Sequence, residues 1–283
     1  MNQRMSQLSQ AIKHTMTSYQ NNYPILENQK SEPFTIKIAN TLEEREAVFR
    51  LAYRVYLDKE YVKKNNQEWL VNDYDQNPST TIFIVKNSSG VVIASATLVF
   101  NDTSVLPTEK IYESEIRQIK TSGSKIVEVS RLVINPDFRN SKDILVLLFN
   151  YMFIYCYHVK HFDTVIMQVN PRHKDYYRKL LNFKEVGGEK FCPIVQNAPA
   201  ILLGIPLYSY YEEVVYYSKT KETDKKVRSL YQHFLNPEQE KLVAYYLIKN
   251  AAPITLEEKL YFGFSQTQLV DLPLSKSYSS SIL

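Results

Sequence analysis

Three polar side chains stand in an otherwise apolar stretch near the middle of the chain. Residues 126–137, IVEVSRLVINPD, have the β-branched, apolar character of a strand that is buried on both faces. Within it lie Glu128, Ser130 and Arg131, whose burial without partners would cost several kcal/mol. An Asn-Pro-Asp turn ends the strand, and an apolar helix follows. An acid, a hydroxyl and a guanidinium in a buried strand that ends at a helix N-terminus predict a reaction centre.

The spacing of these three residues bears on whether they can act together. Side chains alternate between the two faces of a strand, so Glu128 and Ser130 are expected to face one cleft. Arg131 would join them only if the strand is bulged. The alternative interpretation is that Glu128 and Arg131 form an ion pair with a purely structural role.

Composition limits the class of protein. The 283 residues, 44% hydrophobic and 23% charged, are typical of a globular protein with one large domain, or with one domain and a smaller appendage. No run of about 18 apolar residues predicts a membrane helix, and the polar N-terminus predicts no secretory signal. Cys156 and Cys192 suggest reduced thiols in a cytoplasm, and no Cys/His cluster has metal-ligand spacing. The net charge of +4 is too weak to indicate nucleic-acid binding.

Hydrophobic periodicity predicts three regions. Residues 1–33 carry an amphipathic helix pattern, residues 34–210 form an α/β domain with a mixed sheet covered by helices, and residues 211–283 form a helical extension with a flexible serine-rich tail. The predicted strands are 34–38, 80–85, 91–100, 126–134, 164–169 and 200–207, and the predicted helices are 42–58, 108–121, 144–157 and 173–181. Gly187 and Gly188 are expected to form a turn before the last strand.

This order of elements, with its motifs, resembles the GNAT superfamily of acetyltransferases. More narrowly it resembles the long-chain N-acyl amino acid synthases (the N-acyltyrosine synthase-like enzymes) and the related acyl-homoserine-lactone synthases. The matching pieces are VFRLAYRVY at 48–56, NDYD at 72–75, LP at 106–107 leading to YESE at 112–115, EVSRLVI at 128–134 and NPRHKDYYRKLLNF at 170–183. The resemblance implies a GNAT-like splayed sheet and an N-acyltransferase.

The resemblance also implies which acyl donor the enzyme uses. Ordinary GNAT enzymes hold the pyrophosphate of coenzyme A on a glycine-rich turn, but residues 139–144 here contain no glycine. That turn suits the single phosphate of an acyl-phosphopantetheine arm on acyl carrier protein, held by Arg139, Lys142 and the helix N-terminus. Acyl coenzyme A is a less expected donor, and no permanently bound cofactor is expected.

The resemblance assigns roles in the attack of an amine on a thioester. Glu128 would be the general base, with Ser130 beside it in the cleft, and backbone amides near Leu132 and Val133 would steady the oxyanion. Arg131 would orient Glu128 or the carboxylate of the acceptor. Tyr177 would protonate the departing thiolate, with Tyr176 as the alternative.

Partner and acceptor contacts are further expectations. Asp73 and Asp75 could bind the ammonium of the amino acid acceptor. Arg54 could replace an arginine that the relatives carry at the position of Ala52. The acidic carrier protein would dock on a basic patch, defined as Arg172, Lys174, Arg178 and Lys179. Alternative functions are an autoinducer synthase that uses S-adenosylmethionine, or a non-catalytic protein that binds a lipid or an acyl carrier.

Overall fold

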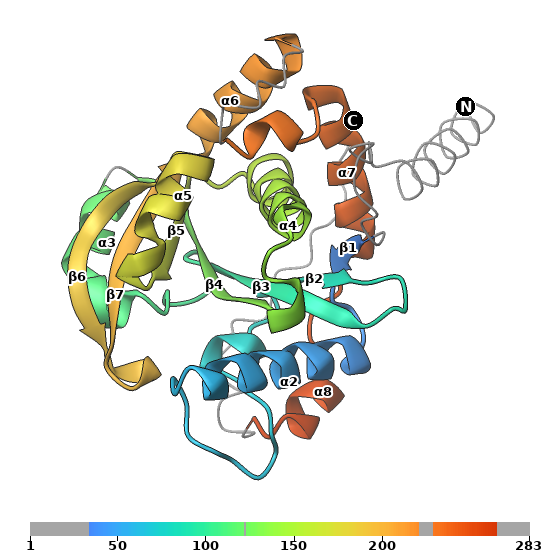
Figure 1. The fold of residues 1–283 in the computed structure, drawn as a ribbon, viewed down its shortest axis with the longest axis vertical. Helices are drawn as coiled ribbons and strands as arrows, with labels where there is room; N and C mark the ends of the chain where they lie inside the picture. Colours follow the sequence, from blue (N-terminus) through green and yellow to red (C-terminus); the bar gives the residue numbers. More distant parts are fainter. Residues whose placement is uncertain (1–33, 122, 221–228, 265–283) are drawn as a thin grey trace.

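Seven strands form one open sheet (Figure 1). A computed structural model describes residues 34–121, 123–220 and 229–264; the predicted N-terminal helix and serine-rich tail lie outside these residues. The strands are β1 (Thr35–Ile38), β2 (Thr81–Lys86), β3 (Val92–Phe100), β4 (Ile126–Ile134), β5 (Thr164–Val169), β6 (Lys184–Cys192) and β7 (Ala198–Pro206). They lie side by side in the order β1-β2-β3-β4-β5-β7-β6, and the sheet is mostly antiparallel.

The sheet opens between β4 and β5, which are its parallel pair. The ladder joins residues 126–128 only to residues 164–166, although both strands continue past it. Beyond this point β4 stays paired with β3, and β5 stays paired with β7. The edge of β4 that faces β5 is therefore unpaired with that strand after Glu128, and a wedge opens in the middle of the sheet.

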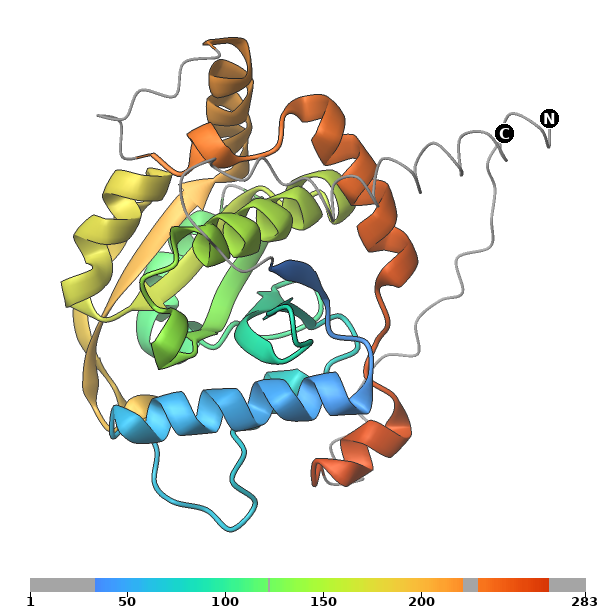
Figure 2. The ribbon, with the colours of Figure 1, turned by 45° about the vertical axis from the view of Figure 1, so that its right-hand side comes forward.

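Helices cover both faces of the sheet (Figures 1 and 2). The described helices are α2 (Leu42–Asp58), α3 (Glu109–Thr121), α4 (Lys142–Ile154), α5 (Lys174–Leu181), α6 (Leu207–Thr220), α7 (Pro237–Asn250) and α8 (Leu256–Tyr261). The apolar helix α4 fills one face, as its sequence predicts, and ends in a π-helical turn at Tyr155–Val159. Helices α2 and α3 cover the other face, where α8 packs beside α2. This arrangement is a mixed α/β fold with a GNAT-like sheet.

Side chains of β4 alternate between the two faces of the sheet, so the strand packs against helices on both faces. Val127 and Val129 belong to the large apolar cluster that contains α4. Ile126 packs with α3, and Val133 packs with α2, on the opposite face. Glu128 and Ser130, which alternate with Val127 and Val129, therefore face the side of α2 and α3.

One predicted turn is wrong. Gly187 and Gly188 do not end a segment but lie inside β6, a strand that sequence reasoning missed. A Cβ atom at Gly187 would lie 2.7 Å from the ring of Tyr112. Tyr112, which is fully buried on α3, donates a hydrogen bond to the carbonyl of Gly188 at 2.9 Å. The glycines therefore allow α3 to approach the strand closely, and do not reverse the chain.

Two features are absent from the described ranges. None of their helices is long and apolar enough to cross a membrane. Within the same ranges, no three His, Cys, Asp or Glu side chains gather in a way that could hold a metal ion.

Candidate active site

A β-bulge in β4 shapes the site. Residues 130 and 133 of β4 oppose Thr97 and Ser95 of β3, so β4 carries one extra residue between them. Arg131 lies at this point with a left-handed φ of 46°, which is uncommon for a side chain larger than glycine. The bulge turns Arg131 to the face of Glu128 and Ser130, which meets the condition set by the sequence for the three to act together.

The three side chains line one pocket of about 650 Å³. Its walls come from the C-terminal part of α2, the segment 61–74, the segment 104–110, the bulged part of β4, the end of β5 and the segment 192–200. The pocket thus lies where β4 and β5 separate. Tyr56, Tyr61 and Tyr74 give it an aromatic wall beside its polar strand.

Glu128 is a buried carboxyl whose hydrogen bonds come from one residue. It is 3% exposed, and its Oε2 accepts from the backbone amide of Thr108 at 2.9 Å and from the Thr108 hydroxyl at 2.7 Å. Burial raises the pKa of Glu128 to about 7, and the two Thr108 hydrogen bonds only partly oppose this effect. A carboxyl with such a pKa can exchange a proton near neutral pH, as a general base must.

Arg131 pairs with Asp75 and not with Glu128. Its two terminal nitrogens each bind one Asp75 carboxylate oxygen at 2.6 Å, and both side chains are buried. Nη1 also donates to the carbonyl of Leu70 at 3.2 Å, and Nη2 donates to the hydroxyl of Thr97 at 3.0 Å. The Nε atom is buried with no hydrogen-bond partner among the described residues. The structural Glu128–Arg131 ion pair considered from the sequence is therefore wrong.

The pairing of Arg131 also corrects the expectation for the two aspartates. Asp75 is 3% exposed and bound to Arg131, so it is not available to an acceptor ammonium. Asp73 precedes it in the short 3₁₀ turn Asp73–Gln76, is exposed and lines the pocket. Of the two aspartates, Asp73 alone remains a candidate for that contact.

Tyr74, between these aspartates, is a site residue that sequence reasoning missed. Its hydroxyl accepts a hydrogen bond from Asn72 Nδ2 at 3.0 Å and lies 3.2 Å from Ser130 Oγ. Burial raises the pKa of Tyr74 well above its usual value, so the hydroxyl keeps its proton. Tyr74 stands inside the acidic NDYD motif at 72–75, which is a partial signal in the sequence. Thr108, the partner of Glu128, gave none.

The structure does not bring Tyr177 to this pocket. Its ring packs against Phe149 and Phe183, with ring centroids 5.9 and 6.4 Å apart, and burial raises its pKa. Tyr176 is 43% exposed on the other side of α5 and does not line the pocket either. The aromatic core beneath α5 accounts for the position of Tyr177.

Three other predicted residues do not line the pocket. Arg139 is exposed and its Nη2 lies 3.8 Å from Asp58, at the end of α2. Lys142, in the first turn of α4, lies 2.8 Å from His233 Nε2, and partial burial lowers its pKa. Arg54 is exposed on α2, two residues before Tyr56, which does line the pocket.

The predicted oxyanion region follows directly after the bulge. Leu132 is half-buried against the α4 cluster, and Val133 is buried on the opposite face. Their side chains do not line the pocket, but their backbone lies on the stretch of β4 that is unpaired with β5. This is where strand amides can reach the wedge.

Two cations line the pocket in the described part of the chain. Arg131 is the buried one, held by Asp75. Lys110 is the exposed one, in the first turn of α3, two residues after Thr108. An anionic group in the pocket would therefore find its accessible positive charge at Lys110.

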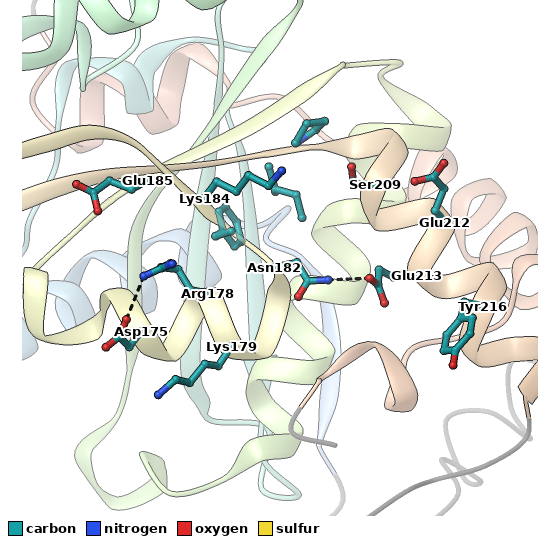
Figure 3. Close-up of a pocket in the computed structure, with 13 residues that line it drawn as sticks. Asp175, Arg178, Lys179, Asn182, Lys184, Glu185, Ser209, Glu212, Glu213 and Tyr216 are labelled. Carbon is teal, nitrogen blue, oxygen red and sulfur yellow. Dashed lines mark hydrogen bonds and ion pairs between the residues drawn. The ribbon is translucent and has the colours of Figure 1, made fainter. Parts of the chain in front are cut away.

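A larger groove of about 1040 Å³ lies elsewhere, between α5, the ends of β6 and β7, and α6 (Figure 3). Its charges are mixed and partly paired: Arg178 lies 3.4 Å from Asp175, and Asn182 donates to Glu213 at 2.7 Å. No residue of β4 lines it. We therefore assign the chemistry to the smaller pocket.

The basic patch is also partly neutralised. Lys174 pairs with Glu185 at 2.5 Å, and Arg178 pairs with Asp175. Arg172 is exposed and donates to the His173 ring at 3.2 Å, and Lys179 is exposed on α5, at the groove drawn in Figure 3. The positive charge that a partner could meet is therefore concentrated at Arg172 and Lys179.

A sheet that splays at a bulged central strand, with helices on both faces and a buried acid at the splay, defines a GNAT-like acyltransferase. The family model described as FeeM, N-acyl amino acid synthase, matches residues 47–206, which is more than half of the chain. The chain belongs to this family of N-acyl amino acid synthases and is an acyltransferase.

The chain is similar to several solved structures. FeeM, an N-acyl amino acid synthase from uncultured soil microbes, superposes with a TM-score of 0.57 at 22% identity, covering 65% of this chain and 96% of FeeM. The acyl-homoserine-lactone synthase LasI reaches 0.48 at 16% identity over 62% of this chain and 91% of its own. The coenzyme A-dependent synthase BjaI, solved with SAM and isopentyl-CoA, reaches 0.48 at 14% over 62% and 83%. No curated protein was found to match the chain.

Proposed function

We propose that this acyltransferase moves a long-chain fatty acyl group from acyl carrier protein to the amino group of an amino acid, in the cytoplasm. The product is an N-acyl amino acid. The observation that carries the proposal is Glu128, a buried carboxyl with a pKa of about 7 in the wall of the pocket where the sheet opens. A base with this pKa suits proton transfer from an ammonium at neutral pH.

The reaction needs two proton transfers. Glu128 takes the first proton from the acceptor ammonium, directly or through a water, and frees the nitrogen lone pair. The amine then forms the C–N bond at the thioester carbonyl, and strand amides near Leu132 and Val133 donate to the oxyanion. As the C–S bond breaks, the thiolate takes a proton from an acid in the pocket. The nitrogen loses its second proton as the amide forms, and this proton returns to that acid, so the ammonium loses two protons in all.

We assign the proton for the thiolate to Tyr74 in place of Tyr177. Tyr74 lines the pocket beside Ser130, and its hydroxyl accepts from Asn72, so its own proton is directed elsewhere. The raised pKa keeps that proton on the oxygen until the thiolate forms. Ser130 positions the Tyr74 hydroxyl at the bulge.

Lys110 and Asp73 are the groups that we assign to the acceptor. An amino acid brings a carboxylate, and Lys110 is the accessible cation of the pocket. Arg131 Nε can add a hydrogen bond, since its two terminal nitrogens are already taken by Asp75. Asp73, exposed at the same pocket, can attract the ammonium.

The donor assignment depends on the turn before α4. A pyrophosphate would need close approach to backbone amides, and residues 139–144 contain no glycine that would allow it. Arg139 and Lys142 can hold a single phosphate, because their present contacts are at the surface and worth at most about 1 kcal/mol each. The pantetheine arm of acyl carrier protein offers one phosphate, and the positive charge at Arg172 and Lys179 suits the acidic carrier.

Mass spectrometry of lipid extracts tests the proposed function. Cells expressing the chain should accumulate N-acyl amino acids, and cells expressing Glu128→Gln or carrying an empty vector should not. With the purified enzyme, kcat/KM should be much higher with acyl carrier protein than with acyl coenzyme A of the same chain length. Acyl-homoserine lactone formed from S-adenosylmethionine, or tight acyl-carrier binding without any product, would replace this proposal by one of the alternatives.

A further inference from the structure

The C-terminal helix α8 lies beyond the part of the chain that the family model matches, yet it packs next to the pocket wall. Figures 1 and 2 show it beside α2, on the face opposite α4. We propose that α8 is a brace that positions the acceptor side of the pocket through Phe262. This inference rests on the proposed function, because it takes the pocket to bind the acyl acceptor.

The helix α8 is fixed to α2 by a buried ion pair. Glu258 closes the capping box of Thr255 and also lies 2.5 Å from Arg45 Nη1, with both charged side chains less than a tenth exposed. Arg45 donates a second hydrogen bond, at 2.7 Å, to the carbonyl of Ala252. Because the Arg45 guanidinium binds both Glu258 and the Ala252 carbonyl, the start of α8 is held in one position relative to α2.

Phe262, just after α8, makes the contact that matters for the pocket. It is 5% exposed, and its ring lies edge-on to Phe49 of α2, with centroids 4.7 Å apart. The same ring lies 5.5 Å from Trp69, the only tryptophan of the chain. Phe262 therefore fills the angle between α2 and the segment that leads into the pocket.

Two connections link Phe262 to Arg131, one through Phe49 and one through Leu70, the residue after Trp69. The Phe49 ring lies under the Arg131 guanidinium, 4.8 Å from its carbon, and the Phe49 carbonyl accepts from the amide of Leu70 at 3.0 Å. The Leu70 carbonyl in turn accepts from Arg131. Leu70 and Arg131 both line the pocket, so the ring of Phe262 is one residue removed from its wall.

The segment that receives this support has little regular structure of its own. Residues 61–72 contain no helix or strand, and Glu68 has a left-handed φ of 55°. Several of its residues line the pocket, among them Tyr61, Val62 and Asn72. A wall built from such a segment needs an external support, since misplacing a bound reactant by about 1 Å can cost about 100-fold in rate.

Steady-state kinetics with full-length Phe262→Ala tests the brace. We expect KM for the amino acid to rise about tenfold or more, while KM for the acyl donor stays within about twofold, because only the acceptor wall loosens. Phe262→Leu, which keeps most of the volume, should restore much of the loss. Glu258→Gln, which keeps the capping hydrogen bonds but removes the charge, should shift KM in the same direction by less.

Leu247→Ala is the matched control. Leu247 is fully buried on α7, in the cluster that contains α4, on the face away from the pocket. It should lower the melting temperature as Phe262→Ala does, yet leave both KM values within about twofold. Equal KM effects of the two variants, or an equal rise in both KM values for Phe262→Ala, would overturn the brace.

Trp69 fluorescence separates the brace from the proposed function. Phe262→Ala should shift the Trp69 emission to longer wavelength, since it removes a ring that covers the indole, and Leu247→Ala should not. An unchanged spectrum contradicts the brace even if no acyl transfer is found. If the wild-type enzyme acylates no amino acid, the proposed function is contradicted, whatever the spectra show.

Discussion

The two sides of β4 meet opposite requirements. Toward α4, Val127 and Val129 pack into a continuous apolar cluster. Toward α2 and α3, Glu128, Ser130 and Arg131 line a pocket. Because neighbouring strand residues face opposite sides, one strand can complete the core and supply a polar site at once. The apolar side holds the strand in place, which allows the polar side to carry a bulge and a left-handed arginine.

On the pocket side lie two carboxylates that are equally buried but have different hydrogen-bond partners. Glu128 and Asp75 are each 3% exposed. Asp75 accepts two hydrogen bonds from a guanidinium, whereas Glu128 accepts only from the neutral Thr108. At equal burial, one carboxylate is therefore held by a guanidinium, whereas the other is a carboxyl whose raised pKa of about 7 lets it release and accept a proton near neutral pH.

The largest expected effect is on activity at Glu128. Glu128→Gln keeps the shape and the acceptor for Thr108 but removes the base, so kcat should fall by about 10² to 10⁴. At pH 5, where folded Glu128 keeps its proton, the melting temperature should stay close to that of the wild type. Glu115→Gln, on the helix α3 that follows Thr108 but paired with Lys190, is the control and should retain full activity. Activity of Glu128→Gln within about threefold of the wild type would make Glu128 a structural residue like Asp75.

The second effect should appear in stability and not primarily in chemistry. Asp75→Asn leaves the Arg131 charge buried without its counter-ion, and breaking such a pair costs about 3 to 5 kcal/mol in the free energy of unfolding. Urea denaturation measures this loss. Asp73→Asn, in the same turn but exposed, should change stability by less than about 0.5 kcal/mol.

A double variant sharpens the same point. Asp75→Asn with Arg131→Gln removes both charges, so it should recover part of the stability that the single variant loses. If the double variant is no more stable than Asp75→Asn, the buried Asp75–Arg131 ion pair does not account for the contact between the 73–76 turn and the bulge in β4.

The third effect is the pH dependence of stability. The folded chain keeps the Glu128 proton up to a pH of about 7, whereas an unfolded glutamate loses it near 4.5. Between these values the folded state binds more protons, so the contribution of Glu128 makes stability fall as the pH rises. A pKa change from 4.5 to about 7 corresponds to about 3 kcal/mol.

Glu128→Gln removes this pH-dependent loss. Urea denaturation at pH 5 and pH 8 should therefore show that the wild type loses about 2 to 3 kcal/mol more than the variant, since part of the full effect already develops below pH 5. An identical loss in both proteins would mean that the Glu128 carboxyl is already ionised at pH 5.

The smallest effect concerns the accessible cation. Lys110→Ala should raise KM about tenfold for an amino acid, since a hydrogen bond to a charged group is worth about 1.5 kcal/mol or more. KM for the corresponding amine without the carboxylate should not change. If both acceptors are affected equally, Lys110 shapes the pocket and does not bind the carboxylate.

The fold could be read from the sequence where the pattern is local. The apolar run after the Asn-Pro-Asp turn predicts α4, and the residues from Ile126 to Ile134 predict a central strand with Glu128 and Ser130 on one face. The strand β6 was missed because Gly187 and Gly188 ordinarily indicate a turn. Gly187 is needed because the ring of Tyr112 packs directly against it. Tyr112 lies 75 residues earlier in the chain, so this contact can be recognised only in the folded structure.

The sequence predicts the acid of the site, Glu128, but not the residues that bind Glu128 and Arg131. The bulge that brings Arg131 to Glu128 has no local signal, and Asp75 and Thr108 come from segments 56 and 20 residues away. The sequence therefore allowed Glu128 and Arg131 to pair with each other, whereas tertiary contacts give each a separate partner. The packing of Tyr177 against Phe149 was hidden for the same reason.

The pH dependence of single-turnover acyl transfer tests the central claim most directly. For the wild type, the rate with saturating acyl carrier protein and amino acid should rise with an apparent pKa of about 7 and then level off. For Glu128→Gln this limb should disappear, and the rate should be lower by about 10² to 10⁴ at the plateau. A wild-type profile without a titration near neutral pH, or the same limb in both proteins, would contradict the assignment of Glu128 as the base.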